Sequence, residues 1–308
     1  MDRHEALEPQ KTNGKTSEAI AMEALQSLIR PRPIIALIGG AGPDAAIDLQ
    51  MKLSRAMKKR LNISFDQEHY RVIVDNNTDI PNRDEALLSK GHSPLFTYID
   101  SAKKLEEMGG DILIISCNTA HTYFNDIQKI TSMKAINMIE ETASFFYNHH
   151  TKIKKVGLLS TFATIQENLY HNAFDKYKVE VVTLDSIHQN NIGQAIYGIK
   201  AGFIGNKELL NDFSKAKLHN IYQSVSKIKS AVAVKSPKDL LLSAIKYFEQ
   251  QGIEAVILGC TEIPLSLNRK EYTGNSILID PTEILANATI DYAISLESKL
   301  EKVFKNNF

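Results

Sequence analysis

Two stretches of the chain, LEEMGGDILIISC at residues 105–117 and FEQQGIEAVILGC at residues 248–260, follow one pattern and decide the fold. They align without a gap, so that a glycine, an acidic residue and a four-residue apolar run coincide before Cys117 and Cys260. These are the only two cysteines of the chain. A short apolar run is typical of a buried strand in a parallel sheet, and open α/β sheets bind ligands at the carboxyl ends of their strands. The sequence therefore predicts a repeated α/β unit with one thiol at the same place in each copy.

Strand-like and helix-like segments alternate on both sides of these stretches. The other expected strands are PIIALIGG, YRVIVDNN and AINMI in the first half, and KKVGLLST, VEVVTL and SILIDP in the second. The expected helices lie near residues 43–59, 93–108, 166–176 and 283–303, with one beginning at Glu140 and one ending at Ala201. Strands that alternate with helices across short turns indicate parallel sheets covered on both faces. We therefore expect two similar α/β domains, each a mainly parallel sheet flanked by helices, with a ligand site in the cleft between them.

The expected boundaries divide the chain into an arm and two domains. Residues 1–32 form a polar N-terminal arm of unknown purpose. The first α/β domain takes residues 33–138 together with 279–308 and carries the first cysteine, and the second takes residues 139–278 and carries the other. The Lys-rich stretch 203–240 reads as a surface insertion with helical spacing of its apolar residues.

Composition excludes several classes of function. The 36 basic residues balance the 36 acidic ones, so a nucleic-acid partner is not expected. No apolar run approaches the roughly 18 residues that a membrane span needs, and no apolar segment of a secretory signal follows the first residues, MDRHEALEPQ. We therefore expect a cytoplasmic protein whose two thiols are not joined as a structural disulfide.

Polar residues follow both thiols directly. CNTAH begins at Cys117 and CTEIP begins at Cys260, and a helix is expected to start at once in each place. The N–H groups of a helix N-terminus lower the pKa of a nearby thiol and favour the thiolate. His121 lies one helical turn beyond the first thiol and either tunes it or is a packed histidine. In a purely structural role, the Glu262 carboxylate interacts favourably with the positive N-terminal end of the helix dipole.

Other motifs point to recognition of an anion. The glycines of GGAGPDAA, at residues 39–46, permit close approach of the backbone to a carboxylate or phosphate, although the motif is not the dinucleotide fingerprint. Arg83, in DNNTDIPNRDEALL, and Lys200, in AIYGIKAG, are candidate carboxylate anchors, each with a solvent-exposed side chain as its alternative. Two distant cysteines without clustered histidines do not make a zinc site, and no GxSxG motif indicates a serine hydrolase.

Taken together, GGAGPDAA, NNTDIPNRDEALL, CNTAH, VGLLSTFATI, AIYGIKAG and GCTEIPL resemble the aspartate/glutamate racemase superfamily, and within it the aspartate-racemase type, over residues 33–300. The resemblance implies two α/β domains with pseudo-twofold symmetry, no cofactor and frequently a homodimer. It implies that the thiols are a catalytic pair. It also implies these residue roles: Cys117 and Cys260 as catalytic residues, and Arg83, Lys200, Asn118, Thr119, Thr161 and Thr261 as substrate-binding residues. The chain departs from the family where Ala41 replaces a methionine and where Asn82 stands in place of a frequent acid.

The resulting expectation is a cofactor-independent racemase that interconverts L- and D-aspartate by two-base proton transfer. Racemisation of glutamate or of several amino acids is the alternative within the same chemistry, and other superfamily members act on hydantoins, maleate or arylmalonates. A non-catalytic amino-acid-binding protein on the same fold is the alternative from another class. Redox regulation through two exposed thiols is a third possibility.

Overall fold

The computed structural model describes residues 32–88, 91–204, 219–220, 235–269 and 272–307. Pro33–Ile294 forms one compact unit that contains both cysteines, and Met1–Arg32 with Ser295–Phe308 forms another. In this other unit, Arg32 Nε lies 3.4 Å from Glu297 Oε1. The expected N-terminal arm, apart from Arg32, and most of the expected insertion at 203–240 lie outside the described residues, and the end of the expected insertion belongs to a helix.

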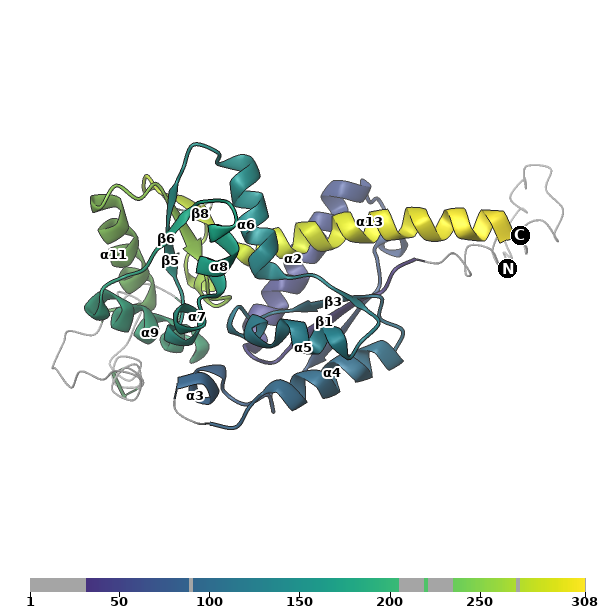
Figure 1. Cartoon of the computed structure of the whole chain (residues 1–308), viewed down its shortest axis with the longest axis horizontal. Helices are drawn as coiled ribbons and strands as arrows, with labels where there is room; N and C mark the ends of the chain where they lie inside the picture. Colours follow the sequence, from purple (N-terminus) through teal and green to yellow (C-terminus); the bar gives the residue numbers. More distant parts are fainter. Residues whose placement is uncertain (1–31, 89–90, 205–218, 221–234, 270–271, 308) are drawn as a thin grey trace, which may run out of the picture. The chain divides into compact units, whose positions relative to one another are not determined.

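The first sheet consists of four parallel strands in the order β2-β1-β3-β4, of which β1 and β3 are labelled in Figure 1. Its strands are β1 (Ile35–Gly39), β2 (Val72–Asn76), β3 (Ile112–Ile115) and β4 (Lys134–Ala135). All residues of β1 and β3 are buried, which explains their continuous apolar sequences. The expected strand AINMI is mostly not a strand, because β4 ends at Ala135 and Asn137 caps a helix by accepting hydrogen bonds from two backbone N–H groups.

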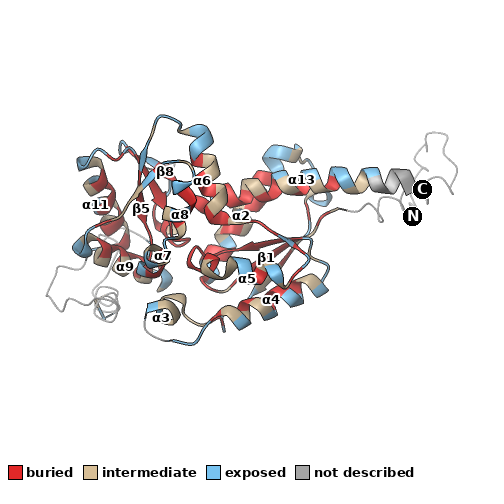
Figure 2. Ribbon diagram, viewed as in Figure 1, coloured by how far each residue is buried: buried red, intermediate tan, exposed pale blue. Residues whose placement is uncertain are grey.

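Helices cover this sheet on both faces (Figures 1 and 2). The helices of this half are α2 (Pro43–Leu61), α3 (Arg83–Leu88), α4 (Leu95–Glu107), the 3-10 helix η2 (Thr119–Tyr123) and α5 (Phe124–Lys129), with a short 3-10 helix at Asp66–Glu68. Leu113 and Ile115 of β3 point to the side of α4 and α5, and Cys117 continues this alternation into the same apolar cluster. The first thiol therefore lies at the end of a fully buried strand.

The second sheet repeats the arrangement, with four parallel strands in the order β6-β5-β7-β8. Its strands are β5 (Lys155–Leu159), β6 (Glu180–Val182), β7 (Ala255–Leu258) and β8 (Ile277–Ile279). The helices of this half are α6 (Met138–His149), α7 (Phe162–Gln166), α8 (Leu169–Asp175), α9 (Ser186–Lys200), α11 (Pro237–Gln250) and α12 (Ile263–Ser266), and the long helix α13 (Pro281–Asn307) follows β8. Helices α9 and α11 pack with Val256, Leu258 and Cys260, whereas α6 and α8 pack with Ala255 and Ile257.

The sequence of α11 accounts for its position. Ser236 Oγ accepts a hydrogen bond from the Asp239 N–H at 3.1 Å, and Pro237 occupies the first turn, where a missing N–H costs nothing. Apolar residues three and four apart then form one buried stripe that ends at Phe248. A Cβ at Gly157 of β5 would lie 2.8 Å from the Phe248 ring, so the glycine lets helix and sheet pack closely.

Two expectations about this half need correction or refinement. The helix expected at residues 166–176 is α8 and begins three residues later; a further helix, α7, precedes it and was not expected, and Asn168 between the two adopts a left-handed conformation with φ 52°. Strand β8 pairs with β7, so the second sheet continues to Ile279, one residue beyond the expected domain boundary. The domain boundaries themselves stay a prediction. Among the described helices, none is both long and apolar enough to cross a membrane.

Candidate functional site

A cavity of about 190 Å³ lies between the two halves, where strands of both sheets end. Its lining includes all eight residues to which the resemblance gives a catalytic or substrate-binding role: Arg83, Cys117, Asn118, Thr119, Thr161, Lys200, Cys260 and Thr261. The volume is below the roughly 300–1,000 Å³ of pockets for drug-sized ligands. The cavity therefore suits a molecule about as small as an amino acid.

Each half contributes one thiol and one cation from equivalent connections. Cys117 follows β3 and Cys260 follows β7, which occupy the same position in the two sheets. Arg83 lies after β2, and Lys200 ends the helix after β6, again an equivalent strand. The cavity is thus assembled from the same two connections of both halves.

His121 is a packed histidine that fixes the main chain beside the first thiol. Its Nδ1 lies 2.9 Å from the carbonyl oxygen of Cys117, and its Nε2 accepts a hydrogen bond from the Met138 N–H at 3.1 Å. Burial lowers its pKa to about 4, so the ring is neutral at pH 7. Of the two roles open from the sequence, the structure supports the structural one.

The second thiol is held by a carboxylate. Cys260 is buried, and its Sγ donates a hydrogen bond to Glu262 Oε2 at 3.0 Å. Burial raises the pKa of the Cys260 thiol well above its usual value, and the Glu262 charge raises it further. The expected net lowering of the pKa is wrong for this thiol, because burial and the Glu262 charge outweigh the lowering by the backbone N–H of Glu262.

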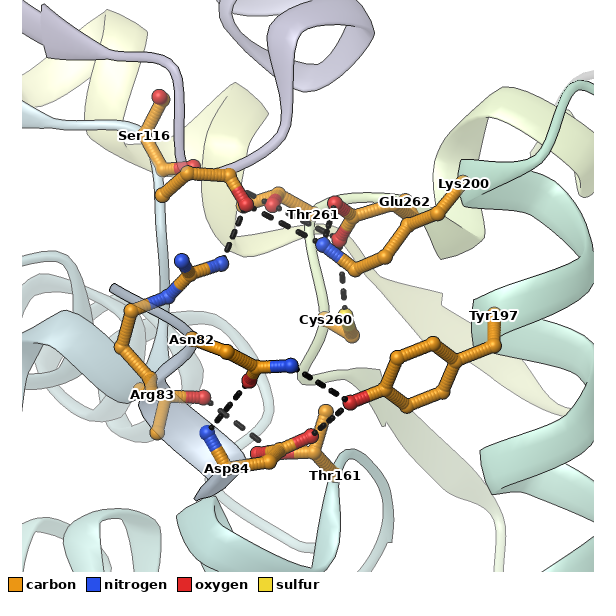
Figure 3. Close-up of polar contacts among 12 residues, drawn as sticks. Asn82, Arg83, Asp84, Ser116, Thr161, Tyr197, Lys200, Cys260, Thr261 and Glu262 are labelled. Carbon is orange, nitrogen blue, oxygen red and sulfur yellow. Dashed lines mark hydrogen bonds and ion pairs between the residues drawn. The ribbon is translucent and has the colours of Figure 1, made fainter. Parts of the chain in front are cut away.

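The buried Glu262 also forms an ion pair with Lys200, whose side chain is 28% exposed (Figure 3). Lys200 Nζ lies 2.6 Å from Glu262 Oε1 and donates a second hydrogen bond to the Ala41 carbonyl at 3.2 Å. Although burial lowers the pKa of Lys200, the Glu262 charge raises it, and the net direction is upward. Conversely, burial raises the pKa of Glu262, Lys200 lowers it, and the net direction is downward. We conclude that both groups are charged, and that Glu262 has more than the dipole role inferred for it.

Arg83 lies beside Cys117, and it shares the Ala41 carbonyl oxygen as an acceptor with Lys200. Its guanidinium donates hydrogen bonds to the carbonyl oxygens of Pro81, at 3.2 Å, and Ala41. Its Nε is buried without a hydrogen-bond partner. Burial lowers the pKa of Arg83, but the neighbouring Cys117 and Tyr98 raise it, so the group stays a cation. A free donor on a fixed cation is suited to binding an anion.

Asp84 and Tyr197 line the same cavity and were not singled out from the sequence. The Tyr197 hydroxyl donates a hydrogen bond to Asp84 Oδ2 at 3.2 Å and accepts one from Asn82 Nδ2 at 3.4 Å (Figure 3). A signal for both was present, since Asp84 adjoins Arg83 and Tyr197 precedes Lys200 by one helical turn. These contacts connect α3 of the first half to α9 of the second.

Asn118 is oriented by a residue from the other half. The Tyr170 hydroxyl donates a hydrogen bond to Asn118 Oδ1 at 2.5 Å, which leaves the Asn118 amide nitrogen buried without a partner. Both residues are almost fully buried. The amide therefore presents a fixed, unused donor from the lining of the cavity.

The three threonines join the halves. Thr119 Oγ1 lies 2.8 Å from Thr164 Oγ1 and 3.3 Å from Thr161 Oγ1, and Thr161 also caps α7. Thr261 Oγ1 donates to the Ser116 carbonyl at 3.3 Å, across 145 positions of sequence. These hydroxyls hold together the segments that carry the two thiols.

The glycine motif serves the packing of the site. Gly40 has φ +86°, and a Cβ there would overlap the Asn77 carbonyl group. A Cβ at Gly42 would overlap Glu262 Oε1. The close approaches at these two glycines are therefore to the loop after β2 and to the Glu262 carboxylate.

Comparison with known proteins agrees with this architecture. Residues 38–289 match the family described as Asp/Glu/Hydantoin racemase. The structure resembles an aspartate racemase from Picrophilus torridus, with a TM-score of 0.66 and 28% identity over 85% of this chain and 94% of that one. An uncharacterised protein of Pectobacterium carotovorum is 28% identical over 171 residues, which are 55% of this chain and 92% of that protein. The broad specificity amino-acid racemase RacX of Bacillus subtilis is 35% identical over 102 residues, 33% of this chain and 43% of that protein. The chain therefore belongs to the Asp/Glu/Hydantoin racemase family.

Proposed function

We infer that this protein is an aspartate racemase that needs no pyridoxal phosphate and transfers protons with Cys117 and Cys260. The observation that carries the proposal is that both thiols, one from each half, line a single small cavity. One sulfur, as thiolate, takes the α-proton from one face of the bound amino acid. The other, as thiol, gives its proton to the opposite face, so the configuration inverts and the two sulfurs exchange protonation states. The roles reverse for the other enantiomer.

The resting proton distribution suits this cycle. Cys260 is held as a thiol because burial and the Glu262 carboxylate raise its pKa, and its S–H is aimed at Glu262 Oε2. It is therefore the proton donor of the resting enzyme, which leaves the base role in the first half-reaction to Cys117, beside the Arg83 cation. After one turnover Cys117 holds the substrate proton and Cys260 is the thiolate.

Hydrogen-bond donors and positive charge close to the substrate carboxylates lower the barrier to loss of the α-proton. The carbanion gains stability as negative charge spreads onto the α-carboxylate, and fixed donors already aimed at that position stabilise it. Arg83 Nε and the Asn118 amide are such donors, buried and without partners. Holding the α-carbon between the two sulfurs also accelerates the reaction, because the reacting groups are already correctly oriented.

Aspartate is the substrate that the site and the relatives favour together. Two cations, Arg83 and Lys200, line a cavity of about 190 Å³, which matches a short diacid. The Picrophilus torridus relative is named an aspartate racemase, whereas the Bacillus subtilis relative is named a broad specificity racemase, so racemisation of several amino acids is the second candidate. A homodimer and a cytoplasmic location stay predictions.

The test is α-proton exchange in heavy water. Either enantiomer of aspartate should gain deuterium at the α-carbon while chiral chromatography follows its conversion to the other. Cys117→Ser and Cys260→Ser should each lower racemisation by about 10²- to 10⁴-fold, because neither thiol performs both proton transfers. Circular dichroism verifies that both variants are folded. Normal racemisation by the double serine variant would refute the two-thiol mechanism.

Substrate range and the use of the thiols need separate measurements. A panel that includes glutamate and neutral amino acids, scored by the same chromatography, separates an aspartate racemase from a broad one. Binding of aspartate without any α-proton exchange would instead indicate a non-catalytic binding protein. Thiol titration with and without aspartate tests redox use, since a ligand in the cavity should shield both sulfurs together.

A further inference from the structure

Three polar atoms of the cavity residues are buried without hydrogen-bond partners, and they differ in kind. Arg83 Nε and Asn118 Nδ2 are donors, whereas Asp84 Oδ1 is an acceptor. Unpaired buried polar atoms are rare in folded proteins, because each costs free energy when no water or ligand satisfies it. Two donors and one anionic acceptor are the complement of a molecule that carries both a carboxylate and an ammonium group.

The Asp84 carboxylate is held rigidly in this position. Its backbone N–H donates to Asn82 Oδ1 at 3.0 Å, at the first turn of α3. Its Oδ2 accepts the hydrogen bond of the Tyr197 hydroxyl, which Asn82 Nδ2 also contacts. Both halves therefore fix the same carboxylate, and Oδ1 is the oxygen left for a ligand.

Neither Arg83 nor Lys200 forms an ion pair with Asp84. Lys200 pairs with Glu262 at 2.6 Å, and Arg83 donates to two main-chain carbonyls. Within the described part of the chain, no ion pair includes Asp84. Burial raises the pKa of Asp84, while the hydroxyls of Thr161 and Tyr197 lower it, and the net direction is upward. A cationic ligand group at Oδ1 would offset this desolvation.

We propose that Asp84 binds the α-ammonium group of the substrate and so selects α-amino diacids over diacids that lack an amino group. The identity of the substrate rests on the proposed function, whereas the binding of an ammonium group by Asp84 does not. Arg83 Nε and the Asn118 amide then face the α-carboxylate. Tyr197 is a positioning residue, because it acts on the ligand only through Asp84.

The experiment compares the binding of aspartate and of succinate, which has the same two carboxylates and no ammonium. Titration calorimetry uses racemic aspartate, so that turnover changes nothing in the composition of the ligand. Wild-type protein should bind aspartate more tightly than succinate. Asp84→Asn should weaken aspartate binding by about 10- to 100-fold and leave succinate binding unchanged or tighter, since a charge-assisted hydrogen bond is lost for one ligand only.

Two further variants make the outcome specific. Asp79→Asn removes the same charge from an exposed residue outside the cavity lining and should retain the wild-type preference. Tyr197→Phe keeps the Asp84 charge but frees its orientation, and should reduce the preference by a smaller factor, about 3-fold. The inference is overturned if wild-type protein binds aspartate no better than succinate, or if Asp84→Asn weakens both ligands equally.

Failure of the racemase proposal gives a different result. If wild-type protein shows the Asp84-dependent preference but no α-proton exchange, the recognition by Asp84 stands and the racemase activity does not. If exchange occurs while Asp84→Asn keeps the full preference for aspartate, the reverse holds.

Discussion

The Cys260 thiol donates its hydrogen bond to Glu262 Oε2 at 3.0 Å, and the other oxygen of that carboxylate contacts Lys200. One buried acid thus connects a proposed proton donor to a proposed carboxylate anchor. Removing its charge affects both partners. This relationship leads to the first prediction.

Glu262→Gln should make Cys260 ionise at lower pH. Burial and the Glu262 charge raise the pKa of this thiol, whereas Lys200 lowers it, so loss of the carboxylate removes one raising influence and leaves the lowering one. The pH at which iodoacetamide modifies Cys260, followed by mass spectrometry of the Cys260 peptide, should therefore decrease. Glu254→Gln, an exposed residue directly before β7, is the matched control and should behave like wild type. Identical modification profiles for Glu262→Gln and wild type would contradict the assignment.

His121 should make the free energy of unfolding depend on pH. Its pKa is about 4 in the folded state against 6.5 in the unfolded state, so the unfolded chain takes up the proton first as the pH falls. The contribution of His121 to the free energy of unfolding is therefore fully present above about pH 6.5 and is lost as the pH falls towards about 4. Over this range the folded state loses about 3 kcal/mol of stability. Urea unfolding at about pH 7 and about pH 5 measures the difference.

His121→Gln removes this titrating group, so the loss of stability between the two pH values should shrink even though the variant is less stable at neutral pH. His149→Gln, on the exposed side of α6, should retain the wild-type difference. An unaltered pH dependence in His121→Gln would show that other groups cause it.

Much of this architecture could be predicted from the sequence, because it depends on local pattern. Continuous apolar runs identified β3 and β7, and their identical flanks placed both thiols at strand ends. The contacts that define the cavity depend instead on residues that meet only in three dimensions. Tyr170 orients Asn118 from 52 positions away, and nothing adjacent to either residue indicates the pair.

The protonation of Cys260 was mispredicted for the same reason. A short helix after the strand suggested a low thiol pKa, but the effect of burial is decided by tertiary packing and acts in the opposite direction. The break between α7 and α8 depends on the left-handed backbone of Asn168, a conformation that asparagine tolerates but does not require.

Lys52→Met should destabilise the protein by about 3–5 kcal/mol. Lys52 Nζ lies 2.6 Å from Asp48 and 2.7 Å from Asp280, with side chains only 6–13% exposed, so the substitution leaves buried carboxylates without their cation. Urea unfolding measures the change. Lys104→Met breaks the Lys104–Asp100 pair on the surface of α4 and should have a much smaller effect. Equal effects of the two substitutions would contradict the importance of burial.

Gly40→Ala should destabilise the protein more than Gly252→Ala. Both glycines have positive φ, which costs an alanine about 1–2 kcal/mol, but only at Gly40 would the new Cβ meet the backbone of Asn77. At Gly252 the added carbon meets nothing within 4 Å. Thermal unfolding of the two variants measures the stability that each loses, and the difference is the cost of the steric clash at Gly40. Equal losses would mean that the loop after β2 moves aside without a loss of stability.

The paired placement of one sulfur and one cation in each half has a consequence for catalysis between mirror-image molecules. Two enantiomers have equal free energies in water, so kcat/KM must be the same in the forward and reverse directions. In a site whose halves are near copies, each half acts on one enantiomer as the other half acts on its mirror image. Equal kcat/KM values in the two directions agree with this symmetry. Features present in only one half, such as Glu262 beside one thiol, allow kcat and KM to differ between the two directions. The ratio kcat/KM nevertheless stays equal.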